Sequence, residues 1–441
     1  MVRAFVAAGE RSARVLTLAK LGGVALSMLW GFAVTYVFVR VLPEAEFRAF
    51  LLLIAFNNFT ISAEFGITNV IYTRLRRHWL GRADGAGESD FRPEEIGVLF
   101  LFLASLIVAG GAAVACAMLL GWIRTGMPAI FLIFFFASAL NIMLLLAKRA
   151  LAAVDRNLVW ELTDIARRVA GLAALFAVLA GAGLFTSVVA MLLINLAGAA
   201  LGMALLHRRA GMRVGHWLAW RRGGGHVRRT YLRDIGASAA LTLSEVAAYN
   251  SPYFLIAALT HDSRLLILFD FTFKIIRAVG TTIRATIEGA LPRLTHSWFV
   301  HDVESFGRSL RRAAAVGMGV AACAGVLLLV AGQAVFAHLY AGKVSLEWSE
   351  LLLLCALLLA LAVMCVSVYV QGALGRFGPL LRQSLPFLAG SILTTPLTMA
   401  MQAGHPGTGT GMIFMTIYAL CFIGAAILHV IAMRRLIRGT R

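Results

Sequence analysis

The chain has 441 residues, of which 60% are hydrophobic and only 14% are charged. Soluble domains usually contain about 25% charged residues, so this composition, with a mean hydropathy of +0.85, excludes an ordinary cytosolic enzyme and a disordered chain. An outer-membrane β-barrel is disfavoured because its strands alternate polar and apolar residues. A net charge of +19 would also suit a nucleic-acid-binding protein, but basic residues accumulate in the cytoplasmic loops of membrane proteins as well. We therefore expect an all-α, polytopic membrane protein that binds no nucleic acid.

Long apolar segments predict about twelve transmembrane helices. Most segments reach about 20 residues, which lets a helix cross about 30 Å of hydrocarbon. The first segment is too long for the apolar region of a cleaved signal peptide, so we expect it to remain as a span. The segments lie near 17–40, 49–73, 95–119, 127–148, 158–180, 183–206, 234–259, 265–292, 313–338, 350–372, 378–401 and 411–433.

The distribution of positive charge predicts the orientation in the membrane. If the N-terminus is cytoplasmic, most of the 40 Lys and Arg residues lie in inside loops or at inner helix ends, as the positive-inside rule requires. The outside loops are then short, which leaves no room for an external catalytic domain. We therefore expect both termini to be cytoplasmic. The cations in or beside the outside loops would be Arg40, Arg48, Arg124, Arg264 and Lys343.

A basic segment in the middle of the sequence predicts the domain organisation. Residues 207–233 are rich in arginine and separate an N-terminal six-helix lobe, 1–206, from a C-terminal six-helix lobe, 234–441. Both halves begin inside, which is compatible with parallel repeats about an axis along the membrane normal. The basic segment mainly determines topology, and contact with anionic head groups would be an additional role.

Motifs for catalysis, metal binding and nucleotide binding are missing from the sequence. The five cysteines fall inside predicted spans without a CxxC pair, and the ten histidines form no HExxH. Gly223-Gly224-Gly225 lacks the Lys-Ser/Thr of a phosphate-binding loop. We expect a protein that is not an enzyme and that has no metal site and no cofactor.

The eighth apolar segment carries a polar stripe at spacings of 4, 3, 4, 3 and 4, so its six residues fall within roughly 80° on one helix face. A Lys or Arg at the bilayer centre costs about 2.5–3.5 kcal/mol, so the stripe must face protein or water. In a structural interpretation, i,i+4 pairs neutralise the cations. In a functional one, the stripe lines a wet cavity that attracts an anion, and Arg277, with no acidic residue three or four positions away, touches substrate. The stripe consists of Asp270, Lys274, Arg277, Thr281, Arg284 and Glu288.

Other predicted spans also contain polar candidates. Glu245 is either one half of an interhelical ion pair or a proton or cation site that competes with substrate. Asn57 is a candidate substrate contact, and Glu64, on the same face, needs a partner or water at its depth. Asp164 and Arg168 predict an ion-pair network at the inner end of the fifth span, with a cytoplasmic gate as the alternative.

Three stretches resemble one transporter family. The first runs from Phe38 to Phe47 with the sequence FVRVLPEAEF, and Arg48 follows where a glycine is usual. The second is the hairpin at 148–161, and the third joins 331–342 to 371–376. On these stretches, the chain is similar to the polysaccharide-transporter branch of the multidrug/oligosaccharidyl-lipid/polysaccharide exporter superfamily, the Wzx-type flippases.

The resemblance implies two six-helix lobes around a central cavity and transport by alternating access in the bacterial inner membrane. The implied cargo is an undecaprenyl-diphosphate-linked oligosaccharide, held by a cationic cavity that would match Lys274, Arg277 and Arg284. A polysaccharide polymerase and a chain-length regulator are the implied partners. Two alternatives stay open: an ion-coupled exporter of drug-like molecules, against which the cation stripe counts, and a membrane polymerase or glycosyltransferase, against which the short outside loops count.

Overall fold

The computed structural model describes residues 13–62, 67–84, 91–260, 262–288, 290–300, 302–404 and 409–438. Within these residues every regular element is a helix, and no strand occurs, so the all-α prediction is confirmed. The chain forms two compact units, Met1–Ala239 and Ala240–Arg441. The expected linker at 207–233 contains the end of one long helix, a short helix and the start of another.

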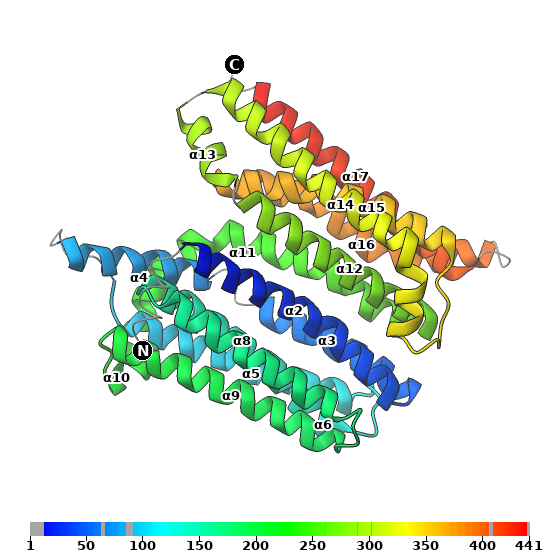
Figure 1. The fold of residues 1–441 in the computed structure, drawn as a ribbon, viewed down its shortest axis with the longest axis horizontal. Coiled ribbons are helices and arrows are strands. Elements are labelled where there is room, and N and C mark those ends of the chain that lie inside the picture. The colour runs from blue at the N-terminus through cyan, green and yellow to red at the C-terminus, as the bar shows by residue number, and fades with distance from the viewer. Residues whose placement is uncertain are drawn as a thin grey trace. The chain divides into compact units, whose positions relative to one another are not determined.

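Among the described residues, ten helices begin in the first unit (Figure 1). The first helix, α2, packs against α8, and α8 packs against α9, which also contacts α6 and α7. The helices are α2 (Ala13–Val41), α3 (Glu44–Ser62), α4 (Ile67–Asp84), α5 (Glu94–Leu119), α6 (Pro128–Ala139), α7 (Asn141–Ala153), α8 (Asn157–Ala177), α9 (Leu184–Arg209), α10 (Val214–Trp217) and α11 (Trp220–Leu259), which continues into the second unit.

Aromatic rings and close glycine contacts hold the first unit together. Phe38 stacks on Phe50 with ring centroids 4.2 Å apart, and the Phe134 ring meets Phe50 edge-on at 5.2 Å. These rings join α2, α3 and α6 and are buried. On α9, a Cβ at Gly202 would lie 2.6 Å from the Trp160 ring of α8. The absence of a side chain therefore lets α8 and α9 approach closely, as small residues do between membrane helices.

The second unit is built around α15. It packs against α14 and α17; α16 packs on α17, and α12 contacts both α14 and α15 (Figure 1). Glycines again mark close approaches, because a Cβ at Gly332 of α14 would lie 2.9 Å from Leu351 of α15. The helices are α12 (Ser263–Glu288), α13 (Leu291–Phe299), α14 (Val303–Leu339), α15 (Trp348–Ala373), α16 (Phe377–Gly404) and α17 (Thr410–Arg438).

Eight helical stretches among the described residues are long and apolar enough to cross a bilayer. They comprise α2 from Leu18, α5, the joined α6 and α7, α9, α14, α15, α16 and α17. The other predicted spans lie on α3–α4, α8, α11 and α12, which carry the intramembrane polar residues singled out in the sequence. The chain is therefore a multi-pass membrane protein.

Several element boundaries differ from the sequence-based expectation. The second predicted span falls on α3, up to Ser62, and on α4, from Ile67, and residues 63–66 lie outside the described part of the chain. The eighth was expected to reach residue 292, but α12 ends at Glu288 and α13 starts afresh at Leu291, followed by Pro292. Proline favours the first turn of a helix because its missing N–H is unpaired there in any case. Hydropathy locates membrane crossings but does not detect such breaks.

Candidate functional site

The polar stripe of the sequence lies on α12, in the second unit. Its first turn is capped by Asp262, whose carboxylate accepts hydrogen bonds from the backbone amides of Arg264 at 2.8 Å and Leu265 at 3.3 Å. Every residue from Leu265 to Phe273 is buried. Beyond Phe273 only one side of the helix stays buried, through Ile276, Val279, Ile283 and Ile287. The C-terminal half of α12 therefore presents a second, polar face that the rest of its unit does not cover.

Asp270, at the buried N-terminal end of the stripe, has three hydrogen-bond donors. The Tyr253 hydroxyl of α11 donates to Oδ1 at 2.8 Å, and the Tyr340 hydroxyl, just beyond α14, donates to Oδ2 at 2.7 Å. Lys274, one turn away on α12, forms an ion pair with the same carboxylate. Asp270 is fully buried and the Lys274 side chain is 11% exposed. This cluster joins three segments of the second unit, and it contains the i,i+4 pair of the structural interpretation.

Arg277 and Arg284 differ from Lys274 because both are exposed on the surface of their unit. The Arg284 guanidinium lies 5.4 Å from the centroid of the Tyr369 ring on α15, within the range of a cation–π contact. Arg284 also acts electrostatically on Glu245 of α11, which is half-buried. Arg277 acts electrostatically on the nearby Lys274. The C-terminal half of α12 thus carries two exposed arginines, one of which, Arg284, lies beside a carboxyl group and an aromatic ring.

Packing within the second unit fixes the position of Glu245. One residue before it, the Ser244 hydroxyl lies 3.0 Å from the Ser384 hydroxyl of α16. One turn after it, the Tyr249 ring packs edge-on against Phe387 of α16, with centroids 5.4 Å apart. Pro252 lies within α11, which continues as a helix to Leu259. The Glu245 carboxyl group therefore lies on a stretch of α11 that contacts α16 both before and after it.

The side chains of two acidic candidates, Glu64 and Glu288, lie outside the described part of the structure. Glu64 lies outside the residues that the structure describes, in the gap between α3 and α4. Glu288 is the last residue of α12, but its side chain is not among those described. A coupling or ion-pair role stays a prediction for both.

Asn57 lies on α3 in the first unit and is half-buried. Its side-chain oxygen Oδ1 is buried and has no hydrogen-bond partner among the described residues. Buried acceptors are normally paired, and an exception calls for an explanation such as a water or a ligand. Asn57 is therefore suited to accept a hydrogen bond from a polar molecule, and its contact with substrate stays a prediction.

Asp164 is the centre of a polar network in the first unit. It is buried and accepts from Arg167 Nη2 at 2.7 Å and from Arg168 Nε at 2.8 Å. Arg167 also donates to the side-chain oxygen of Asn195, whose amide donates to the Ala137 carbonyl at 2.7 Å. This network joins α8 to α9 and α6. The network contains the ion pairs that the sequence predicts, and a gating role for Asp164 and Arg168 stays a prediction.

Sequence reasoning missed a charged cluster around Glu95, a fully buried residue of α5. Its carboxylate receives a bidentate pair from Arg74 of α4, at 2.9 Å and 2.8 Å, and lies 3.0 Å from His226 of α11. The sequence signal was weak: an acidic residue in the first turn of a helix is common because the N-terminal dipole favours it. Its partners are distant in sequence, so periodicity could not identify them.

Two further buried carboxylates were not paired by sequence reasoning. Glu161 of α8 is fully buried and lies 2.9 Å from the Lys148 ammonium of α7. Glu350 of α15 is also fully buried and lies 2.8 Å from the Arg264 guanidinium. Each pair lies within one unit and connects two of its helices, α7 with α8 and α12 with α15. In the part of the chain that is described, no group of three or more His, Cys, Asp or Glu residues could hold a metal ion.

Comparison with known proteins identifies the fold. No protein-family model matches the sequence, and no curated protein matches it. Solved structures of MATE transporters do match. An inward-facing multidrug resistance MATE family transporter of the MOP superfamily is 13% identical, with a TM-score of 0.67 over 94% of this chain and 95% of that one.

Two further MATE structures agree with this result. The eukaryotic MATE transporter AtDTX14 is 14% identical, with a TM-score of 0.65 and coverage of 97% of both chains. A mutant of the Vibrio cholerae MATE transporter VcmN is also 14% identical, with a TM-score of 0.65 and coverage of 98% of both chains. The chain therefore has the fold of these two-lobed helical transporters along almost its whole length, while identities this low leave the cargo open.

Proposed function

We propose that this protein is a membrane transporter that moves a lipid-diphosphate-linked oligosaccharide across the bacterial inner membrane by alternating access. The observation that carries the proposal is the pair of exposed guanidinium groups, Arg277 and Arg284, on the inner half of α12. The fold supports transport, because the structures that share it are transporters and one of them is inward-facing.

The depth of the two arginines supports a water-filled path. At about 1.5 Å per residue, Arg277 lies roughly 21 Å along α12 from its outer end at Ser263, and Arg284 lies roughly 32 Å along it. Hydrocarbon is about 30 Å thick, so Arg277 falls within it. An arginine facing acyl chains at that depth costs several kcal/mol. The polar face of α12 is therefore proposed to face the cavity through which cargo passes.

The chemistry of the arginines favours a diphosphate. A guanidinium group offers parallel N–H donors that match two oxygens of a phosphate, and it stays charged at any physiological pH. Arg277 and Arg284 lie seven residues apart on one face, about 10 Å along the helix. The diphosphate would bind along this face of α12 while the isoprenoid tail remains in lipid. Lys274 already neutralises Asp270, so we assign it to holding α12 in place and not to direct contact with substrate.

The test is complementation of a clean deletion strain with Arg277→Ala, Arg277→Lys and wild type. We expect the alanine variant to insert normally but to lose surface polysaccharide, and lipid-linked repeats identified by mass should accumulate. The lysine variant should retain part of the output, since it keeps the charge without the planar fork. Arg435→Ala, at the exposed end of α17, is the control and should complement fully. Normal polysaccharide with Arg277→Ala would remove Arg277 from the cargo path.

A second candidate function is ion-coupled export of drug-like molecules. It is favoured by the multidrug resistance transporter among the matching structures and by a half-buried carboxyl group, Glu245, beside Arg284. In this case the deletion strain would become sensitive to toxic compounds without accumulating lipid-linked repeats. Glu245→Gln would then abolish export at every pH. Accumulated repeats together with unchanged drug sensitivity would instead exclude this second function.

The proposed function also implies protein partners. A repeat unit delivered to the outer leaflet must be consumed by a polymerase, and a chain-length regulator would act with it. Co-purification of the transporter with such enzymes from membranes would test this association.

A further inference from the structure

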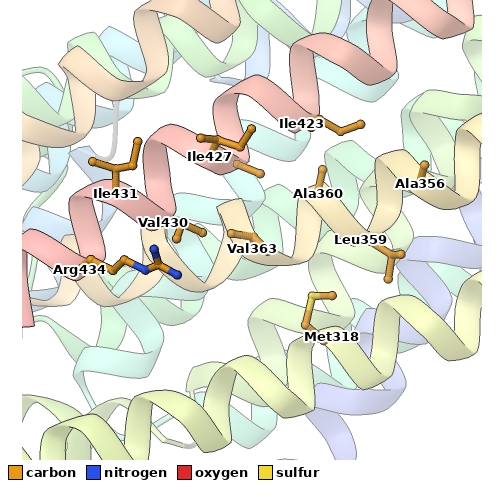
Figure 2. A pocket seen from close by; sticks show the side chains of 11 residues that line it. Met318, Ala356, Leu359, Ala360, Val363, Ile423, Ile427, Val430, Ile431 and Arg434 are labelled. Atoms are coloured by element: carbon orange, nitrogen blue, oxygen red, sulfur yellow. The ribbon is translucent and has the colours of Figure 1, made fainter.

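A groove of about 420 Å³ lies on the second unit, outside the site described above (Figure 2). It is lined by α14, α15 and α17, and α15 packs against the other two helices. Its lining is apolar except for one charged side chain, Arg434. Figure 2 shows Arg434 at one end of the groove, with Ile423 and Ala356 toward the other. The groove is therefore an apolar channel with a single positive charge at one end.

The groove lies on the opposite side of α15 from α12. A Cβ at Gly280 of α12 would lie 3.9 Å from Cys365 Sγ and 4.0 Å from Leu361 Cδ2, so these two α15 residues face α12. The four groove-lining residues of α15, between Ala356 and Val363, point about 170° away from them at roughly 100° per residue. The polar face of α12 is thus separated from the groove by α15, and a molecule held by one does not touch the other.

The length of the groove matches one leaflet of a bilayer. From Ile423 to Arg434, α17 rises about 16 Å. The hydrocarbon of a bilayer is about 30 Å thick, so one leaflet is about 15 Å. The walls carry aliphatic side chains that are partly open to the surroundings, such as Ile427, which is 55% exposed. An acyl chain of one leaflet would cover them along their whole length.

We propose that this groove binds a membrane phospholipid with an anionic head group. One acyl chain lies against α14, α15 and α17, and the Arg434 guanidinium forms a charge-assisted pair with the phosphate. The expected orientation places the end of α17 on the cytoplasmic side, where anionic lipids attract basic residues near the surface. The binding site does not depend on the cargo, because it lies on the other side of α15 from Arg277 and Arg284.

A simpler role for Arg434 makes a different prediction. A cation in the last turns of α17 stabilises the carbonyl end of the helix, and a long arginine side chain reaches the membrane surface from such a position. Arg435 is also exposed and satisfies both conditions, but it does not line the groove. The two neighbouring arginines therefore separate lipid binding in the groove from general surface attraction.

Native mass spectrometry of the delipidated full-length protein tests the proposal. Phosphatidylglycerol or phosphatidylcholine is titrated into wild type, Arg434→Gln and Arg435→Gln, each shown to be monodisperse. We expect wild type to bind phosphatidylglycerol more tightly than phosphatidylcholine. Arg434→Gln should weaken binding of the first phosphatidylglycerol about tenfold or more, since a hydrogen bond to a charged group contributes about 1.5–3 kcal/mol. Arg435→Gln should bind as wild type does.

A second pair of variants tests the apolar part of the groove. Ala356→Phe fills the end away from Arg434 and should weaken phosphatidylglycerol binding, whereas Ala322→Phe, on the exposed surface of α14 and outside the groove, should not. Equal losses in the two arginine variants, or equal binding of both lipids by wild type, would overturn the proposal. Displacement of phosphatidylglycerol by an isoprenyl diphosphate at lower concentration would also overturn it, because the groove would then hold a cargo tail.

Discussion

The buried Asp270–Lys274 pair allows the structural role of the α12 stripe to be separated from its transport role. In Asp270→Asn the Lys274 ammonium loses its counter-charge while the side chains around it stay in place. Removing one partner of a buried ion pair costs about 3–5 kcal/mol, whereas replacing both by apolar or neutral groups of similar size is often nearly neutral. We therefore expect Asp270→Asn to be strongly destabilised and the double variant Asp270→Asn/Lys274→Met to recover to within about 1–2 kcal/mol of wild type.

Denaturant unfolding in mild detergent would measure these free energies as a double-mutant cycle. Tyr340→Phe is the reference variant, since it removes one hydrogen bond to the carboxylate without unpairing a charge, and it should cost about 1.5–3 kcal/mol. The same variants are then tested for polysaccharide output in the deletion strain. A double variant as unstable as Asp270→Asn would refute the ion-pair argument. A stable double variant that fails to complement would show that the Asp270–Lys274 pair is needed for transport itself and not only for stability.

Two further predictions concern local packing and a helix cap. Gly97→Ala should lower the free energy of unfolding by about 1–3 kcal/mol, because its Cβ would overlap the backbone carbonyl of His216. The Cβ of Gly225→Ala would meet nothing within 4 Å, so this control should leave the free energy of unfolding unchanged or raise it by up to about 1 kcal/mol through better helix propensity. Equal effects of the two alanines in the same unfolding assay would contradict the close approach of α5 to α10. At the start of α14, the Ser305 amide donates to Asp302 at 2.9 Å, which lowers the pKa of that carboxyl below 3.8. The ionised Asp302 carboxylate therefore caps α14 at neutral pH, and the cap is lost when the carboxylate is protonated in acid. Asp302→Ala should speed hydrogen exchange of the backbone amides in the first turn of α14 at neutral pH. This difference between the variant and wild type should disappear as the pH falls below 3.8 through the folded pKa of Asp302.

Composition and hydropathy predicted the all-α fold class and the multi-pass character of the chain, while the orientation drawn from the positive charges stays a prediction. The described part of each predicted apolar segment lies mainly on one helix or on two consecutive helices, and the all-α class follows from composition, because backbone groups in lipid must pair within the segment. The i,i+4 spacing on α12 also predicted the pair between Asp270 and Lys274. These features depend on residues close together in the chain, whose geometry is set by the helical repeat.

The tertiary structure decided which helix faces meet. Tyr253 and Tyr340 complete the Asp270 cluster from positions 17 and 70 residues away, and His226 reaches Glu95 from 131 residues away. Helical periodicity states which residues share a face, but it does not state which face of another helix will lie against it. That choice depends on side-chain volumes and close glycine contacts across the whole unit. For this reason the sequence identified the residues of the α12 stripe. Only the tertiary structure showed that the Lys274 side chain is largely covered, at 11% exposure, while Arg277 and Arg284 are exposed.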